Sequence, residues 1–178
     1  MLLVVAATER ELAPVEGART ALCGIGPVEA AVATARALAE ERPSAVLHVG
    51  IAGARGVAPL TLVLGSEALY CDATGPLVPS LALPDGDLLA QLHAAFPEAA
   101  LRPIGTSARV GGSRDVEVEA MEGFAVLRAC ELAGVPAVEV RVVSNEVDEP
   151  DRALWRFDDA FAKLAETLPR LVAIASAR

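Results

Sequence analysis

The chain has 178 residues and a formal net charge of −9; 53% of the residues are hydrophobic and only 3% are aromatic. This length suits one domain, 1–178, whose single core is built mainly of Ala, Val and Leu. The acidic balance disfavours nucleic acid or an anionic membrane surface as a partner, but it does not exclude a small anionic ligand.

Strands are predicted where apolar or β-branched residues run together between turn residues. The predicted strands, in chain order, are Leu2–Ala7, Ala45–Val49, Thr61–Leu64, Glu67–Cys71, Arg102–Ser107 and Ala137–Ser144. Helices are predicted where apolar residues recur at helical spacing. They are Val28–Glu41, Asp87–Phe96, Glu119–Ala133 and a C-terminal stripe from Phe157 to Ala175, which Pro169 should kink. Because strands alternate with helices, we expect one α/β domain with a twisted, mostly parallel central sheet and helices on both faces.

Cysteine and histidine usage predicts neither a disulfide framework nor a metal site. The three cysteines, Cys23, Cys71 and Cys130, have no metal-type spacing, and an odd number suits paired disulfides poorly. His48 and His93 are too few and too far apart for a histidine-based metal site. No apolar run is long enough to cross a bilayer, because charged residues, Pro or Gly interrupt each one. We therefore expect a reduced, cytoplasmic protein.

Glu11 follows the first predicted strand by a few residues. A carboxylate at the carboxyl end of a buried strand faces the crevice where α/β proteins bind ligands, and there it could polarise a water molecule. The alternative is that Glu9 and Glu11 are solvated residues in the first turn of a helix, where acids are favoured. Spacing alone favours the second interpretation.

Two glycine turns follow buried segments. Gly24-Ile-Gly26 opens a helix, and Gly50-Ile51-Ala52-Gly53 closes the second strand. Backbone N–H groups of either turn could contact a ligand oxygen. The alternative is turn formation and close packing, which usually accounts for glycine patterns this short.

The stretch from Glu119 to Asn145 combines an acidic helix start with a strand that ends on polar residues. Glu119 and Glu122 could complement a helix dipole, but a carboxylate also accepts two hydrogen bonds from a ribose diol. Met121 would lie against the sugar or in the core. At the strand end, Ser144 and Asn145 could bind a ligand, or Asn145 could cap a helix or form an Asx turn. Glu139 and Arg141 share one strand face and should pair.

These segments, in this order, resemble the purine nucleoside phosphorylase/nucleosidase superfamily. The matching pieces are A-A-T-E-R-E, C-G-I-G-P-V-E-A-A, H-V-G-I-A-G-A, E-A-M-E-G-F-A and V-R-V-V-S-N, which span nearly the whole chain. The S-N ending, followed by Asp151, Arg152 and Trp155, makes the chain most similar to the futalosine hydrolases, nucleosidases of menaquinone biosynthesis. The resemblance implies a cofactor-free homo-oligomer, dimer-based, that binds a small nucleoside and cleaves its N-ribosidic bond.

The resemblance also implies roles for individual residues. Glu11 matches the glutamate that activates water, and Met121 and Glu122 match a ribose-binding Met-Glu pair. Asn145 stands where adenine-cleaving nucleosidases carry an aspartate that protonates the purine. An amide can donate to a 6-oxopurine and still accept from a ring N–H, so Asn145 favours hypoxanthine as the leaving base. Ser107 and Val110 match the region that contacts the base in relatives.

Ile51 bears on the choice between hydrolysis and phosphorolysis. Phosphorylases of the superfamily carry a hydroxyl residue at this place to help bind phosphate, whereas an apolar residue suits a water nucleophile better. The chain departs from the family in two shortened segments, one before the C-G-I-G stretch and one from Ser107 to Glu119. The sequence therefore leaves two alternatives open: a methylthioadenosine/adenosylhomocysteine nucleosidase and a non-catalytic nucleoside-binding protein. It also leaves open which of three arginines, Arg109, Arg114 or Arg152, meets the ribose 5′ substituent.

Overall fold

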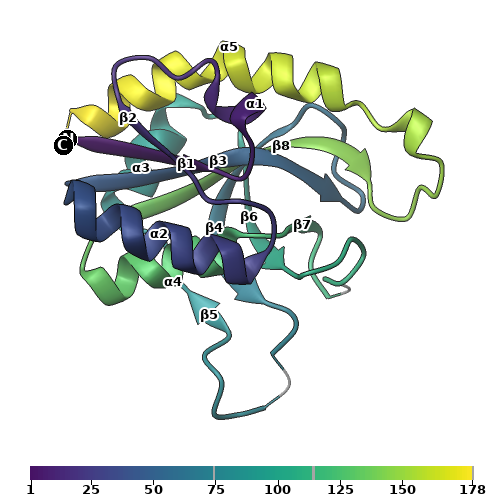
Figure 1. Cartoon of the computed structure of the whole chain (residues 1–178). Coiled ribbons are helices and arrows are strands. Elements are labelled where there is room, and N and C mark those ends of the chain that lie inside the picture. The colour runs from purple at the N-terminus through teal and green to yellow at the C-terminus, as the bar shows by residue number, and fades with distance from the viewer. Residues whose placement is uncertain (74, 114, 178) are drawn as a thin grey trace.

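A computed structural model describes residues 1–73, 75–113 and 115–177 (Figure 1). The strands are β1 Leu2–Ala6, β2 Arg19–Leu22, β3 Ala45–Ala54, β4 Leu62–Tyr70, β5 Leu81–Ala82, β6 Ala100–Thr106, β7 Val118–Ala120 and β8 Ala137–Glu146. The helices are α1 Glu9–Leu12, α2 Pro27–Glu41, α3 Gly86–Ala95, α4 Gly123–Ala133, the short 3₁₀ helix η1 Arg152–Leu154, and α5 Phe157–Ser176. The helix α5 continues through Pro169.

The central sheet closes on itself. In the described part of the chain β3 is parallel to β1 and β8, β8 is antiparallel to β4, and β4 is parallel to β6. The strand β6 is parallel to β7, and β7 pairs antiparallel with the far end of β3. The path from β3 through β8, β4, β6 and β7 therefore returns to β3. The expected α/β fold with a mostly parallel sheet is confirmed, and the closure is a feature that the strand pattern did not predict.

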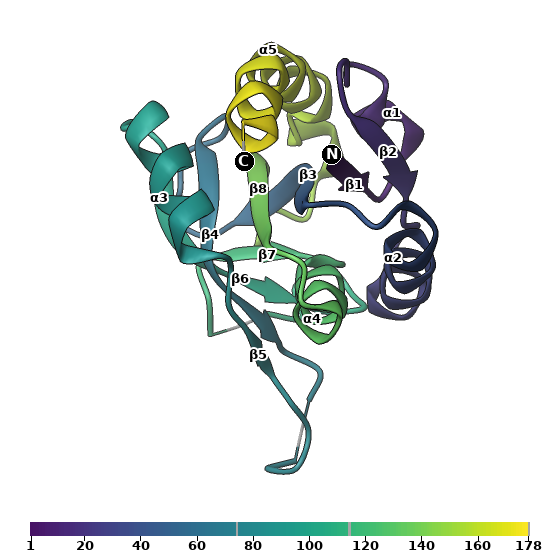
Figure 2. The same ribbon diagram turned by 90° about the vertical axis from the view of Figure 1, so that its left-hand side faces the viewer.

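Helices cover the sheet on two sides, which explains the continuous apolar run of β1. Side chains of alternate strand residues point to opposite faces. Leu2 and Val4 belong to one buried cluster with residues of α3 and α5, whereas Leu3 and Val5 belong to another with residues of α2 and α4. Figure 2 shows α5 on one side of the sheet and α2 with α4 on the other. Both faces of β1 are therefore buried.

Glycine positions were predicted to end or divide strands, and here the prediction is wrong. The strand β3 runs through Gly50 and Gly53 to Ala54, because β8 pairs beside it along this whole length. The single strand β4 likewise includes Gly65, where its register with β6 shifts. A paired neighbour keeps a glycine-containing segment extended, and the glycines mark places where other atoms approach the backbone closely.

The predicted helix Glu119–Ala133 begins four residues too early. Val118–Ala120 form β7, which is held by β3 on one side and β6 on the other, and α4 starts at Gly123. The Glu119 carboxylate lies outside the helix and accepts hydrogen bonds from the N–H groups of Gly111 and Ser113. Sheet pairing and these loop contacts override the helical pattern of the sequence.

Candidate functional site

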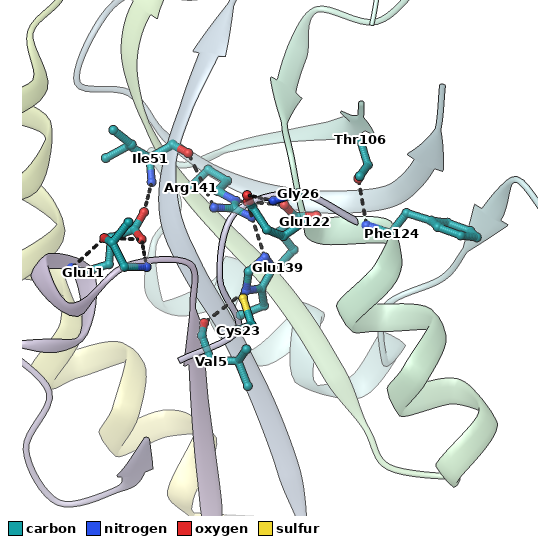
Figure 3. Close-up of polar contacts among 12 residues, drawn as sticks. Val5, Glu11, Cys23, Gly26, Ile51, Thr106, Glu122, Phe124, Glu139 and Arg141 are labelled. Atoms are coloured by element: carbon teal, nitrogen blue, oxygen red, sulfur yellow. Dashed lines mark hydrogen bonds and ion pairs between the residues drawn. The ribbon is translucent and has the colours of Figure 1, made fainter. Parts of the chain in front are cut away.

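Glu11 is buried in α1, which follows β1, and is only 3% exposed. Its Oε2 accepts hydrogen bonds from the N–H of Thr8 at 2.9 Å and from the Thr8 hydroxyl at 2.8 Å. Its Oε1 accepts one from the N–H of Ile51 at 3.2 Å (Figure 3). Glu11 does stand in the first turn of α1, as the helix interpretation held, and forms a capping box with Thr8. It is not solvated, however, and its carboxylate links the turn after β1, at Thr8, to Ile51 of β3.

Glu122 precedes α4 and turns its carboxylate toward the start of α2. Its side chain makes no cap hydrogen bond in its own helix. Instead Oε1 accepts from the N–H of Gly26 at 3.1 Å, and Oε2 lies 3.4 Å from Nη2 of Arg141. Gly26 has a φ of 96°, a conformation that glycine adopts readily. The interpretation of Glu122 as a complement to its own helix dipole is therefore wrong in detail, because the carboxylate binds the N-terminus of another helix.

Arg141 lies between the two glutamates and was missed as a site residue by the sequence analysis. It is 1% exposed, and its Nε donates to Glu139 at 2.8 Å, which confirms the predicted pair. Burial disfavours its charge, but the carboxylates of Glu139, Glu122 and Glu11 outweigh that effect and raise the pKa of Arg141. The guanidinium is therefore a fixed positive charge. The sequence did contain a signal for Arg141, because charged residues inside an otherwise apolar strand are seldom buried without partners.

Gly50 separates Glu11 from Arg141. A β-carbon at this position would lie 2.6 Å from Oε1 of Glu11 and would overlap Nη1 of Arg141. The Nη1 group also lies 3.5 Å from the carbonyl oxygen of Ile51. Glycine at position 50 thus lets a carboxylate and a guanidinium approach the same point of β3.

Ser144 and Asn145 lie within β8, beside the end of β3. Asn145 is 6% exposed and pairs in register with Gly53. The Ser144 hydroxyl lies 3.1 Å from the carbonyl oxygen of Ala52 and 2.8 Å from Oδ1 of Asn145, and Nδ2 of Asn145 donates to the carbonyl of Glu146 at 3.2 Å. The capping interpretation of Asn145 is wrong, since it is a strand residue. These contacts leave one N–H and one lone pair of the amide available for a ligand.

The loop after β6 is organised around acidic side chains. The Ser107 hydroxyl donates to Asp72 at 2.8 Å, and the backbone N–H of Ser107 donates to the carbonyl of Ala120. Ala120 precedes Met121, which is partly exposed. Ser107 is thus buried beside β7, whereas Val110 is 50% exposed and is not drawn into this arrangement.

Of the three arginines considered for the ribose 5′ substituent, Arg109 is exposed. Arg152 lies over the ring of Trp155, with its guanidinium carbon 5.3 Å from the ring centre. Arg114 lies outside the described residues.

The two groups of predicted residues meet along β3. Glu11 contacts Ile51 and Ser144 contacts Ala52, so the acidic cluster and the Ser-Asn pair lie at successive residues of one strand. Within residues 1–73, 75–113 and 115–177, no three His, Cys, Asp or Glu side chains are arranged to hold a metal ion. No helix in the same ranges is both long and apolar enough to cross a membrane. The geometry supports proton transfer and hydrogen bonding to a polar organic ligand.

Comparison with known proteins places this geometry in context. A model of the phosphorylase superfamily matches residues 17–113 and 105–177. The chain is 32% identical over 180 residues to futalosine hydrolase of Streptomyces coelicolor, covering 85% of this chain and 77% of that protein. It is 32% identical over 177 residues to futalosine hydrolase of Thermus thermophilus, with 84% and 79% covered.

Two solved structures show the same fold. A 5′-methylthioadenosine/S-adenosylhomocysteine nucleosidase of Neisseria meningitidis in complex with methylthio-immucillin-A has a TM-score of 0.80 at 25% identity, covering 98% of this chain and 97% of that one. A futalosine hydrolase mutant of Helicobacter pylori has a TM-score of 0.83 at 17% identity, with 99% and 98% covered.

Proposed function

Since the chain belongs to the phosphorylase superfamily and, within it, to the futalosine hydrolases, we propose that it hydrolyses the N-ribosidic bond of futalosine and releases hypoxanthine, as a step of menaquinone biosynthesis. The observation that carries this proposal is the buried Glu11 carboxylate, held by Thr8 and Ile51 beside the Arg141 guanidinium. A carboxylate in this setting is fixed in position to take a proton from water, and no cofactor is needed for that step.

In the proposed reaction Glu11 removes a proton from a water molecule as the water oxygen attacks the ribose anomeric carbon. The bond from this carbon to the purine nitrogen breaks, and its electron pair leaves with the base. The purine nitrogen takes up a proton to replace the broken bond, and Glu11 gives up the proton that it gained from water. The products are therefore the free sugar and neutral hypoxanthine. The transition state is oxocarbenium-like, and the negative charge of the cluster formed by Glu11 and Glu122 stabilises it.

Ribose binding is assigned to Glu122 and Met121. The Oε1 and Oε2 atoms of Glu122 are held by Gly26 and Arg141, which fixes the carboxylate while leaving further lone pairs for the ribose hydroxyls. Met121 is partly exposed next to it and offers an apolar contact for the sugar face. Fixing the sugar in this way contributes to rate by orientation.

The choice of base is assigned to Asn145. Ser144 lies near Oδ1 and the carbonyl of Glu146 near Nδ2, so the amide has a defined orientation. Its remaining N–H can donate to the carbonyl or N7 of a 6-oxopurine, and its remaining lone pair can accept from a ring N–H. The backbone of Ile51, Ala52 and Gly53 lines the same edge of β3, and the apolar Ile51 favours water over phosphate as the nucleophile. Ser107 is assigned to the base side of the site.

The test is release of hypoxanthine from futalosine and from inosine, each with and without phosphate. We expect release from futalosine that does not depend on phosphate. The Glu11→Gln variant should lose about 10²- to 10⁴-fold in kcat while still binding the substrate. The control is Glu9→Gln, which changes an exposed residue of the same helix and should keep wild-type activity. Absence of hypoxanthine under every condition would refute the proposal, and full activity of Glu11→Gln would remove Glu11 from the mechanism.

A second candidate is hydrolysis of 5′-methylthioadenosine or S-adenosylhomocysteine. The similarity to the Neisseria meningitidis nucleosidase, at 25% identity, favours it. Release of adenine from these compounds at a rate comparable to hypoxanthine release would support it. Binding of nucleosides by calorimetry without any hydrolysis would support a non-catalytic binding protein instead.

We also propose that the protein forms a homodimer through a groove between α2 and α4. The groove has a volume of about 880 Å³. Its exposed apolar side chains include Val28, Val32 and Leu132, which are 72%, 67% and 73% exposed. An apolar surface of this kind on two adjacent helices suits a self-complementary contact with a second copy.

Sedimentation velocity should give a dimer for the wild type and a monomer for Val32→Asp. The control is Leu154→Asp, which removes a comparably exposed apolar residue from η1, outside the groove, and should stay dimeric. A monomeric wild type would refute the proposal.

A further inference from the structure

A buried polar pair, Glu139 and His48, contacts Arg141. Glu139 of β8 and His48 of β3 are both fully buried, and they are register partners on adjacent strands. Neither residue was assigned a role in the proposed reaction. A buried acid and a buried imidazole both cost free energy of folding unless their hydrogen bonds are made, so their contacts indicate what they do.

The contacts of His48 fix its protonation state. Its Nδ1 lies 3.0 Å from the carbonyl oxygen of Val5, and its Nε2 contacts Nη2 of Arg141. A carbonyl oxygen only accepts, so Nδ1 carries the hydrogen, and Nε2 offers its lone pair to the guanidinium. Burial, and then the charge of Arg141, lower the pKa of His48 well below its usual value. His48 is thus a neutral hydrogen-bond acceptor for Arg141.

Glu139 fits into a space that only glycine leaves at the start of α4. Its Oε1 accepts from Nε of Arg141, while a β-carbon at Gly123 would overlap its carboxylate. Its Oε2 is buried without a hydrogen-bond partner among the described residues. Burial raises the pKa of Glu139, so the protein keeps this carboxylate at a cost in stability. The hydrogen bond from Arg141 is the interaction that Glu139 makes in return for this loss of stability.

The two contacts divide the guanidinium of Arg141 into two edges. Arginine has five N–H donors in one plane. The Nε donor and one Nη2 donor face Glu139 and His48, whereas the remaining donors face Glu122, the carbonyl of Ile51 and the neighbourhood of Glu11. Because the group is planar, fixing one edge fixes the other.

We propose that Glu139 and His48 are positioning residues, which hold Arg141 so that its outer edge is aimed at Glu122 and at the water-activating end of the site. This inference rests on the proposed hydrolysis for its kinetic consequence, but the clamp itself is a property of the protein without substrate. It predicts that the pair affects kcat more than KM, since neither residue reaches the ribose or the base and Glu122 keeps its hydrogen bond from the Gly26 N–H when Arg141 shifts.

The kinetic test uses Glu139→Leu, Glu139→Gln and His48→Leu, with Thr34→Val as control. Thr34 is buried in α2 and its hydroxyl has no described partner, so its loss removes a buried polar atom away from the cluster. Glu139→Leu and His48→Leu should lose about 100-fold in kcat with KM changed less than about threefold. Glu139→Gln keeps an acceptor for Nε and should recover most of the loss, and Thr34→Val should match the wild type. A folded Glu139→Leu protein with wild-type kcat would overturn the proposal.

A spectroscopic test does not need activity and leaves Glu139, His48 and Arg141 unchanged. In the wild type, nitrogen NMR should show His48 protonated only at Nδ1, and the Nε–H of Arg141 should exchange slowly with solvent. The histidine signals can be assigned with His93→Gln, since the chain has two histidines. A His48 protonated at Nε2, or a rapidly exchanging Arg141 Nε–H, would overturn the clamp. If no nucleoside is hydrolysed but these signals are observed, the proposed function fails and the clamp stands.

Discussion

Replacing Gly50 by alanine should reduce the activity about 100-fold while leaving the protein folded. The added β-carbon would lie 2.6 Å from Oε1 of Glu11, which is 0.8 Å short of the 3.4 Å where ordinary contact begins, and it would overlap Nη1 of Arg141. Both obstructing atoms are ends of side chains, so they can move while β3 stays in place. The hydrogen bond from the Ile51 N–H to Glu11, 3.2 Å long, is then lost.

The magnitudes follow from this displacement. Overpacking a well-packed interior costs about 1–3 kcal/mol of the free energy of unfolding, which lowers Tm by about 2–12 °C in a chain of this size. A catalytic group misplaced by about 1 Å loses about 100-fold in rate. The expected result is therefore a folded protein, slightly less stable, with kcat for futalosine reduced by about two orders of magnitude.

The assay is hypoxanthine release at saturating futalosine, combined with thermal unfolding of the same samples. Gly86→Ala is the matched control, since Gly86 starts α3 and a β-carbon there meets open space. It should keep full activity and gain about 0.4–1 kcal/mol in stability. If Gly50→Ala kept kcat within about twofold of the wild type, the close approach of Glu11 and Arg141 would not matter for the reaction.

Two further predictions concern the base and the buried imidazole. Asn145→Asp should change the ratio of kcat/KM for methylthioadenosine to kcat/KM for futalosine by more than about tenfold in favour of adenine release, because a carboxyl can supply a proton to N7. An unchanged ratio would contradict the role of Asn145. Lowering the pH from 7 to 5 should cost the wild type more of its unfolding free energy than it costs His48→Leu, by at most about 2 kcal/mol, as measured by urea denaturation. The sign follows because the lowered pKa keeps His48 neutral in the folded protein, whereas the unfolded chain binds a proton below about pH 6.5. Equal pH dependence in the two proteins would contradict it.

Much of the candidate site could be predicted because its residues stand next to strand ends. Glu11 follows β1, and Ile51 and Asn145 lie near the ends of β3 and β8. Because the carboxyl ends of parallel strands meet at one edge of a sheet, these residues are expected to lie close together. The family assignment made from these segments is confirmed by the superfamily match and by the futalosine hydrolases at 32% identity. The chemical roles of the individual residues stay predictions.

What could not be predicted depends on contacts between distant parts of the chain. Glu119 has the local pattern of a helix, but pairing of its neighbours with β3 and β6 makes it a strand residue. Gly50 has the pattern of a turn, but β8 keeps it extended. In both cases the local preference is worth only a fraction of a kcal/mol, and tertiary hydrogen bonds outweigh it.

The layered α/β fold follows from the sequence alone, because apolar runs and helical stripes leave few ways to bury both faces of each strand. The sequence also determined the family and the presence of Glu11, Glu122 and Asn145. The closure of the sheet, and the place of Arg141 between two glutamates and in contact with Glu139 and His48, become visible only in the folded chain. Periodicity indicates which face of an element a residue buries, whereas the partners of a buried charge come from strands and helices distant in the chain.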